Sequence, residues 1–229
     1  MNKDGVKPLL GVIGGMGADA TACFYEKLHC AQAVASEQEY IDVLIYSATT
    51  TPDRTAFIIG ESTESPLSSL VHAACTLENA GATHIAIPCV TAHFFYNELT
   101  ASVNVPVINL LEEIARYVFK HKFEKVGLLA TEGTLQSKLF HSEFEKSGVA
   151  LITPSDDIQT ELTDIIYRIK QGKVTPPDAI ENMVSKLRNA GADAVILGCT
   201  ELCTCQAIDN TIDTLDILVN ASLSYCSPD

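Results

Sequence analysis

The hydrophobic positions of this chain fall into short apolar runs that alternate with longer amphipathic stretches. Runs of about four to eight apolar residues have the length of buried strands, and apolar residues at helical spacing indicate helices packed on a sheet. We therefore predict an α/β fold with mostly parallel sheets flanked by helices. Strands are predicted at 9–14, 42–47, 84–88, 107–109, 125–129, 150–152, 194–198 and 214–217. Helices are predicted at 18–36, 65–80, 92–101, 111–121, 136–147, 158–171, 177–190 and 217–225.

One segment of this pattern occurs twice, at 77–91 and at 187–201. Each copy contains the end of a predicted helix, an Asn-Ala-Gly-Ala stop, an apolar run and then a cysteine, which is Cys89 in the first copy and Cys199 in the second. A second repeated sequence pattern lies upstream of each copy. The repeat predicts two pseudo-symmetric α/β units, each of which delivers one thiol to the tip of a strand.

The predicted units meet at a shared cleft. Ligands of open parallel sheets bind beyond the carboxyl ends of the strands, where both cysteines are expected. The loop at 14–17, which contains Met16, and the loop at 131–134, which contains Thr131 and Thr134, also follow predicted strands. All of these side chains are therefore expected at the same cleft, with the two thiols on opposite sides of it.

The domain boundary is predicted near Val105-Pro106, midway along the chain. Residues 1–105 with 213–229 form the first predicted domain, because the last predicted helix crosses back to complete it. Residues 106–212 form the second. Two domains of this size are compatible with 229 residues, of which 47% are hydrophobic.

Charge narrows the range of partners. The 15 Lys and Arg residues are outnumbered by 29 Asp and Glu residues, and the formal net charge is −14. This balance argues against nucleic acid or an anionic membrane as a partner. An anionic substrate would therefore need cations close to its binding site.

The expected location is the cytoplasm. No apolar run approaches the roughly 18 residues of a membrane span. The first apolar stretch, at 9–16, is short and precedes an amphipathic stretch, so it indicates a strand and not a signal peptide. The eight cysteines are scattered through helix and strand patterns. We expect them to be reduced, because a chain of this length does not need disulfide staples.

Both cysteines of the repeat precede a predicted helix start, where backbone N–H groups and the helix dipole favour a thiolate. Thr91 and Thr200 lie beside the thiols. Their hydroxyls either cap the helices or hold a substrate carboxylate at the helix ends, and the two roles are compatible.

Four further side chains are candidates, each with a plain structural alternative. Arg54 suits bidentate pairing with a carboxylate, although a lone arginine in a polar loop is commonly a surface residue. Lys170 lies near the end of a predicted helix, where cations are favoured in any case. Glu201 either orients or relays a proton, or simply occupies a first helical turn. His93 either assists the first thiol or is a solvated helix position.

Two segments of the sequence partly match the patterns of other kinds of binding site. The segment 15–20 fits the G-x-G-x-x-A dinucleotide fingerprint, but the second strand ends in Ser-Ala, where an acidic ribose ligand is expected. Cys199, Cys203 and Cys205 have spacings that a soft metal accepts, but no CxxC pair or histidine accompanies them. The sequence therefore predicts no nucleotide site and no metal site.

Several motifs together resemble the aspartate/glutamate racemase superfamily along nearly the whole chain, and most closely its aspartate racemases. The motifs are Gly14-Gly15-Met16-Gly17, Pro52-Asp53-Arg54-Thr55-Ala56, Pro88-Cys89-x-Thr91-Ala92-His93, Leu128-Leu129-Ala130-Thr131-x-Gly133-Thr134 and Gly198-Cys199-Thr200-Glu201. The resemblance implies two pseudo-symmetric α/β domains with the active site between them, a homodimer, and racemisation by two cysteines without a cofactor.

The resemblance also implies roles for individual residues. Cys89 and Cys199 match the catalytic pair, and Arg54 and Lys170 match the cations that recognise the side-chain carboxylate of aspartate. The residues that match substrate-holding positions around the α-carboxylate are Thr91, Thr134 and Thr200. The family motif carries a substrate-binding asparagine after its first cysteine, and Val90 replaces it here. We expect this replacement to change affinity or substrate choice.

The expected activity is the interconversion of L- and D-aspartate, or of a closely related acidic amino acid, by proton transfer at Cα between two cysteines. Two alternative functions are also compatible with the sequence. One is a cysteine-dependent isomerase or decarboxylase of the same superfamily that acts on another dicarboxylate. The other is a degenerate amino-acid-binding protein, which Val90 suggests, although binding alone would require neither thiol.

Overall fold

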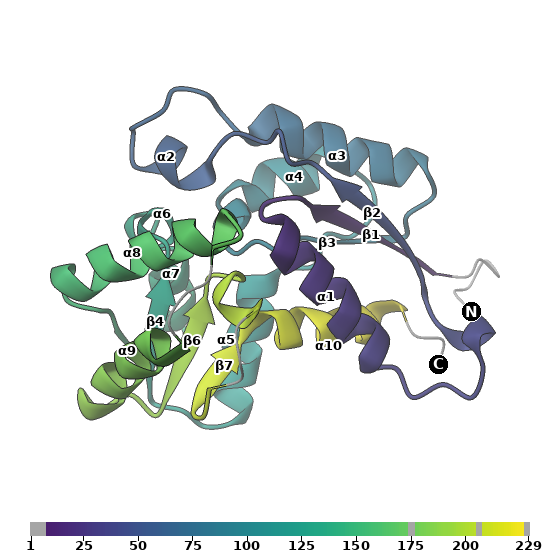
Figure 1. The fold of residues 1–229 in the computed structure, drawn as a ribbon. Helices are drawn as coiled ribbons and strands as arrows, with labels where there is room; N and C mark the ends of the chain where they lie inside the picture. Colours follow the sequence, from purple (N-terminus) through teal and green to yellow (C-terminus); the bar gives the residue numbers. More distant parts are fainter. Residues whose placement is uncertain (1–7, 174–176, 205–207, 227–229) are drawn as a thin grey trace.

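The structure of the protein is a computed structural model that describes residues 8–173, 177–204 and 208–226. The described chain forms two sheets whose strand pairs are all parallel (Figure 1). The first sheet has the order β2-β1-β3 and contains β1 (Leu9–Gly14), β2 (Asp42–Ser47) and β3 (His84–Ala86). The second has the order β5-β4-β6-β7 and contains β4 (Lys125–Ala130), β5 (Ala150–Ile152), β6 (Ala194–Gly198) and β7 (Thr211–Asp213).

Helices surround both sheets. In Figure 1, α3 and α4 lie on one face of the first sheet, and α1 and α10 lie on the other. The α-helices are α1 (Ala18–Cys30), α2 (Arg54–Ile58), α3 (Leu67–Asn79), α4 (Tyr96–Ser102), α5 (Leu110–Lys120), α6 (Glu132–Gln136), α7 (Leu139–Glu145), α8 (Asp156–Lys170), α9 (Pro177–Asn189) and α10 (Thr214–Cys226). The 3-10 helices are η1 (Glu37–Glu39), η2 (Thr91–Phe95) and η3 (Leu202–Thr204). Within the described part of the chain, no helix combines the length and apolar character needed to cross a bilayer.

The repeated Asn-Ala-Gly-Ala segments end α3 and α9 in the same way. Gly81 and Gly191 have φ angles of +96° and +101°, a backbone conformation that only glycine adopts at low cost. The alanine that follows each glycine donates its N–H to the carbonyl of Leu77 or Leu187, at 3.0 and 3.2 Å. These matched helix ends direct the chain into β3 and β6, the strands that precede the two thiols.

The apolar core is continuous between the two sheets. One cluster of buried side chains includes Val12 of β1, Phe24 of α1, Leu128 of β4 and Leu218 of α10. A second cluster, which includes Leu70 of α3, covers the opposite face of the first sheet. The first cluster is therefore shared by the two sheets, and the second belongs to the first sheet alone.

The last helix joins the two halves of the chain. It packs against α1 and α5 and also contacts β3 and β6. Lys27 of α1 lies 2.6 Å from the Asp213 carboxylate and 2.7 Å from the Asp216 carboxylate, where α10 begins. On these contacts we propose that residues 213–229 complete a first domain formed by 1–105, and that 106–212 form the second.

Two predicted strands are wrong in position. At 107–109, Val107 makes only an isolated parallel bridge to Ile85. The chain then turns into α5, because the Asn109 side chain accepts the first free N–H groups of that helix. The strand predicted at 214–217 lies earlier, at β7, because Asp213 caps α10 in the same way and a helix begins at Thr214.

Several helix predictions also differ from the structure. The helix predicted at 18–36 ends at Cys30, and the one predicted at 92–101 begins as a 3-10 helix. The helix predicted at 136–147 covers only α7, because Lys138 adopts a left-handed conformation that separates α7 from α6. The two five-residue helices, α2 and α6, were not predicted. Their capping side chains, Asp53 and Thr131, accept hydrogen bonds from Ala56 and Thr134.

Candidate active site

The two thiols lie at equivalent places in the two sheets. Cys199 directly follows β6, and Cys89 comes shortly after β3, and both side chains are buried, at 4% and 6% exposure. The Thr200 hydroxyl donates a hydrogen bond of 3.1 Å to the carbonyl of Pro88. Because these residues adjoin the two cysteines, this bond brings the two cysteine loops together.

The helix starts expected after the cysteines are short 3-10 turns. Cys89 precedes η2, and Cys199 precedes η3. Turns of this length align few peptide dipoles, so they supply less positive potential than the predicted α-helices would. The charges that act on the two sulfur atoms come instead from side chains.

Cys199 is held in its protonated form by a carboxylate. Its thiol donates a 2.8 Å hydrogen bond to Oε2 of Glu201. Burial and the negative charge of Glu201 raise the pKa of Cys199 well above its ordinary value. The other carboxylate oxygen, Oε1, faces Lys170 at 3.9 Å and is otherwise unpaired. A Cβ atom on Gly17 would lie 3.0 Å from this oxygen, so glycine leaves room for the carboxylate.

Replacing Glu201 by Gln is expected to lower the pKa of Cys199, because the neighbouring charge is removed while the shape is kept. In the proton transfer that the sequence predicts, Cys199 donates a proton only as a thiol. The activity predicted for the direction that uses it as the acid is lost as pH rises through its pKa, so that loss should move to lower pH in the variant. The measurement is the pH profile of kcat/KM with each enantiomer.

A suitable control is Glu181→Gln, which removes the same charge from an exposed position on α9. The alkaline limb of this control is expected to match the wild type. An unchanged alkaline limb in Glu201→Gln would show that the carboxylate does not set the protonation of Cys199.

Arg54 is buried at 7% exposure, which excludes the surface-residue alternative. It opens α2, which Asp53 caps. Its guanidinium donates to the backbone carbonyls of Met16 at 3.1 Å, Pro52 at 3.1 Å and Thr51 at 3.4 Å, while its buried Nε has no partner. Burial alone would lower its pKa, but Cys89, Asp53 and Glu201 raise it overall. Arg54 is therefore a fixed cation beside the first thiol.

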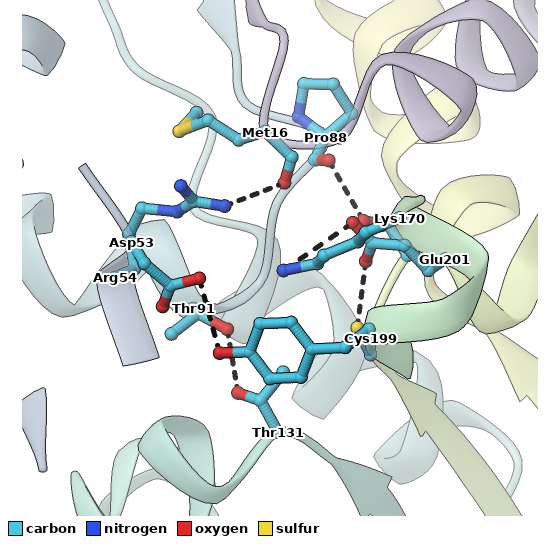
Figure 2. Close-up of polar contacts among 12 residues, drawn as sticks. Met16, Asp53, Arg54, Pro88, Thr91, Thr131, Lys170, Cys199 and Glu201 are labelled. Carbon is cyan, nitrogen blue, oxygen red and sulfur yellow. Dashed lines mark hydrogen bonds and ion pairs between the residues drawn. The ribbon is translucent and has the colours of Figure 1, made fainter. Parts of the chain in front are cut away.

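Lys170 is the second cation of the site. It is the last residue of α8, and its ammonium lies between Glu201 and the ring of Tyr167, 5.4 Å from the ring centroid. Burial would lower its pKa, but the charges of Glu201 and the two cysteines raise it. Arg54 and Lys170 thus reach the site from opposite halves of the chain, as Figure 2 shows.

Three threonine hydroxyls form a triangle between the halves. Thr91 lies 3.0 Å from both Thr131 and Thr134, and those two are 3.0 Å apart. All three side chains are buried. This hydroxyl triangle joins the loop after Cys89 to the start of α6, and its O–H groups are donors suited to a carboxylate.

Val90 and His93 are structural neighbours of the first thiol. Val90 is buried in the apolar cluster that spans both sheets. The solvated position considered for His93 is wrong, because its ring is buried and accepts the Leu110 N–H at Nε2. The other ring nitrogen then carries the proton that binds the Cys89 carbonyl at 3.0 Å. Burial also lowers the pKa of His93, so the ring is neutral and fixes the cysteine loop.

Several residues that shape the site were not among the predicted site residues. Gly17 leaves room for the Glu201 carboxylate, and Asp53 accepts a 3.3 Å hydrogen bond from the Tyr167 hydroxyl. A Cβ on Gly133 would lie 2.9 Å from Cα of Thr55, where α6 meets α2. Gly17, Asp53, Thr55 and Gly133 lie within the motifs that carry the family resemblance. Tyr167 carried only one signal, its place one turn before Lys170 on the same helix.

The soft-metal alternative finds no ligand cluster among the described residues. Among residues 8–173, 177–204 and 208–226, no group of three or more His, Cys, Asp or Glu side chains is arranged to hold a metal ion. Cys205, one of the three cysteines considered as soft-metal ligands, lies outside the described residues. A cavity of about 560 Å³ between α1, β7 and α10 is lined by Cys23 and Asp213, and neither Cys89 nor Cys199 lines it.

Comparison with known proteins identifies relatives over nearly the whole chain. The family model for Asp/Glu/Hydantoin racemase matches residues 13–221. The broad specificity amino-acid racemase RacX of Bacillus subtilis strain 168 is 27% identical over 201 residues, which cover 85% of this chain and 86% of that protein.

Solved structures show the same fold. The aspartate racemase of Picrophilus torridus superposes with a TM-score of 0.86 at 26% identity, covering 96% of this chain and 94% of that one. An aspartate racemase homologue from Pyrococcus horikoshii OT3 gives a TM-score of 0.77 at 27% identity, with coverage of 97% and 100%.

Proposed function

Because the chain belongs to the Asp/Glu/hydantoin racemase family, we propose that it interconverts the L and D forms of aspartate or a closely related acidic amino acid. The observation that carries this proposal is the pair of buried thiols at equivalent strand ends, whose loops are joined by the Thr200 to Pro88 hydrogen bond. Acid and base on opposite faces of Cα are the requirement for inversion without a cofactor.

The surroundings of the thiols favour a starting arrangement for the reaction. Cys199 is the acid, since its proton is held by Glu201. We assign Cys89 as the base, because Cys199 already holds its proton and the buried Arg54 guanidinium lies beside Cys89. The Cys89 thiolate removes the Cα proton of one enantiomer, the electron pair passes into the α-carboxylate, and Cys199 protonates the opposite face. The two roles are exchanged for the other enantiomer.

The carbanionic intermediate requires strong stabilisation, because a Cα–H bond is a very weak acid. We assign the α-carboxylate to the hydroxyl triangle of Thr91, Thr131 and Thr134, whose hydroxyls are buried and therefore more effective than in water. We assign the side-chain carboxylate to Arg54 and Lys170. Val90, where the family motif has asparagine, removes a polar partner and is expected to tune substrate choice.

We further propose that the enzyme acts in the cytoplasm as a homodimer. The cysteines of the described residues are free thiols, which suits a reducing compartment. The homodimer rests on the family resemblance.

Incorporation of solvent deuterium at Cα, measured with a panel of L and D amino acids, tests the proposal. The expected result is deuterium uptake coupled to inversion with aspartate or another acidic amino acid. Inversion-free turnover of another dicarboxylate would favour the isomerase or decarboxylase alternative. Binding without exchange would favour the amino-acid-binding alternative that Val90 raises.

A further inference from the structure

Tyr167 contacts both cation-bearing segments of the site, through its hydroxyl and through its ring. It lies on α8, one turn before Lys170. We propose that Tyr167 is a positioning residue that places Arg54 and Lys170 for a substrate bearing a side-chain carboxylate. This inference rests on the proposed function and adds to it a specificity-determining residue.

The phenol acts on Arg54 through its neighbour. Its hydroxyl donates a 3.3 Å hydrogen bond to Oδ2 of Asp53, a residue 114 positions away. The other oxygen, Oδ1, accepts the N–H of Ala56 at 2.9 Å, which caps α2. Both carboxylate oxygens of Asp53 are thereby held in place. Asp53 in turn fixes the first turn of α2, the helix that begins at Arg54. Tyr167 therefore ties this turn to α8 by one hydrogen bond.

The ring acts on Lys170 directly. The ammonium lies 5.4 Å from the ring centroid, within the distance at which a cation is attracted to an aromatic face. Its only ion-pair partner among the described residues is Glu201, at 3.9 Å, a distance too long for a strong hydrogen bond. The ring thus limits the space that the flexible lysine side chain explores, and it does so without neutralising its charge.

One side chain consequently couples two cations that come from different halves of the chain. The local electrostatics agree with this assignment. Burial alone would raise the pKa of Asp53, but the Ala56 N–H, Lys170, Arg54 and the Tyr167 hydroxyl lower it overall. Burial and the Asp53 charge raise the pKa of Tyr167, so the phenol keeps its proton and remains a donor. The guanidinium of Arg54 and the ammonium of Lys170 are thereby held at a fixed separation before a substrate carboxylate binds between them.

Two substitutions separate the functions of the phenol. Tyr167→Phe removes the bond to Asp53 and keeps the ring beneath Lys170, whereas Tyr167→Leu removes both. With aspartate as substrate, we expect Tyr167→Phe to raise KM about threefold to tenfold with little change in kcat. Tyr167→Leu should lower kcat/KM further. With alanine, which lacks a side-chain carboxylate, both variants should resemble the wild type.

The partner residue provides a matched control. Asp53→Asn keeps a helix-capping side chain and removes its charge. If the phenol acts through Asp53, the double variant Tyr167→Phe with Asp53→Asn should be no worse than the more impaired single variant. Losses that multiply in the double variant, or equal losses with aspartate and alanine, would overturn the assignment.

Binding of succinate by calorimetry separates this inference from the proposed activity. Succinate carries two carboxylates and has no amino group, so it reports on the cations without turnover. We expect its Kd to rise about threefold to tenfold in Tyr167→Phe. If the wild type racemises no amino acid but this rise is found, only the proposed activity fails. An unchanged Kd, or no succinate binding by the wild type, overturns the role of Tyr167.

Discussion

Replacing Cys199 by Ala is expected to abolish racemisation of both enantiomers, by about a thousandfold or more. A positioned acid or base contributes typically 10²- to 10⁴-fold, and inversion requires one on each face of Cα. The remaining Cys89 can still remove a proton from one enantiomer and return it to the same face. We therefore expect deuterium exchange without inversion for that enantiomer only. Chiral chromatography combined with mass spectrometry of the recovered amino acid measures both.

The reciprocal variant, Cys89→Ala, should lose inversion as well and should retain exchange, if any, with the opposite enantiomer. Cys75→Ala serves as the control, since this half-buried cysteine lies on α3, away from both strand ends. It should racemise at the wild-type rate. Substantial inversion by Cys199→Ala would refute the assignment of the two thiols to two faces.

Replacing Arg54 by Ala is expected to lower kcat/KM for aspartate by about 30-fold to several thousandfold. Removing one member of a buried, hydrogen-bonded charge pair typically costs about 2–5 kcal/mol. A neutral amino acid such as alanine offers no second carboxylate, so its kcat/KM should fall far less. Steady-state kinetics with both substrates give the ratio of the two losses.

The guanidinium also binds three backbone carbonyls, so the same substitution is expected to lower the melting temperature. Arg54→Lys controls for this effect, because it keeps the charge and loses the planar array of donors. It should recover part of the activity with aspartate. Equal losses with aspartate and alanine in Arg54→Ala would indicate a role in the fold and not in substrate selection.

The sequence predicted best those features that local chemistry determines. The ends of α3 and α9 follow from Gly81 and Gly191, which adopt a conformation that other residues avoid. Strands β1, β2, β5 and β6 were predicted at their observed limits. The short helices α2 and α6 were missed because five residues show no helical periodicity, and their capping signals are common in loops.

The sequence indicated which residues to examine, but not which contacts they make. The strand pattern placed Cys89 and Cys199 at one sheet edge, and in the structure Arg54 and Lys170 lie near enough to Cys89 for its charge to raise the pKa of both. Which carbonyls Arg54 binds depends on the path of loops distant in sequence. The contact between Tyr167 and Asp53 spans 114 positions, and no periodicity or spacing rule encodes a pair that far apart.

The hydroxyl triangle of Thr91, Thr131 and Thr134 has a consequence for ligand discrimination. Three hydroxyl groups carry three protons, and the triangle contains three oxygen-to-oxygen contacts, so one proton serves each contact. An arriving ligand oxygen must therefore exchange an existing hydrogen bond for a new one. A neutral amide or ester gains almost nothing in that exchange, while an anion gains the stronger, charge-assisted bond. The hydroxyl triangle is therefore expected to discriminate against uncharged analogues of the substrate.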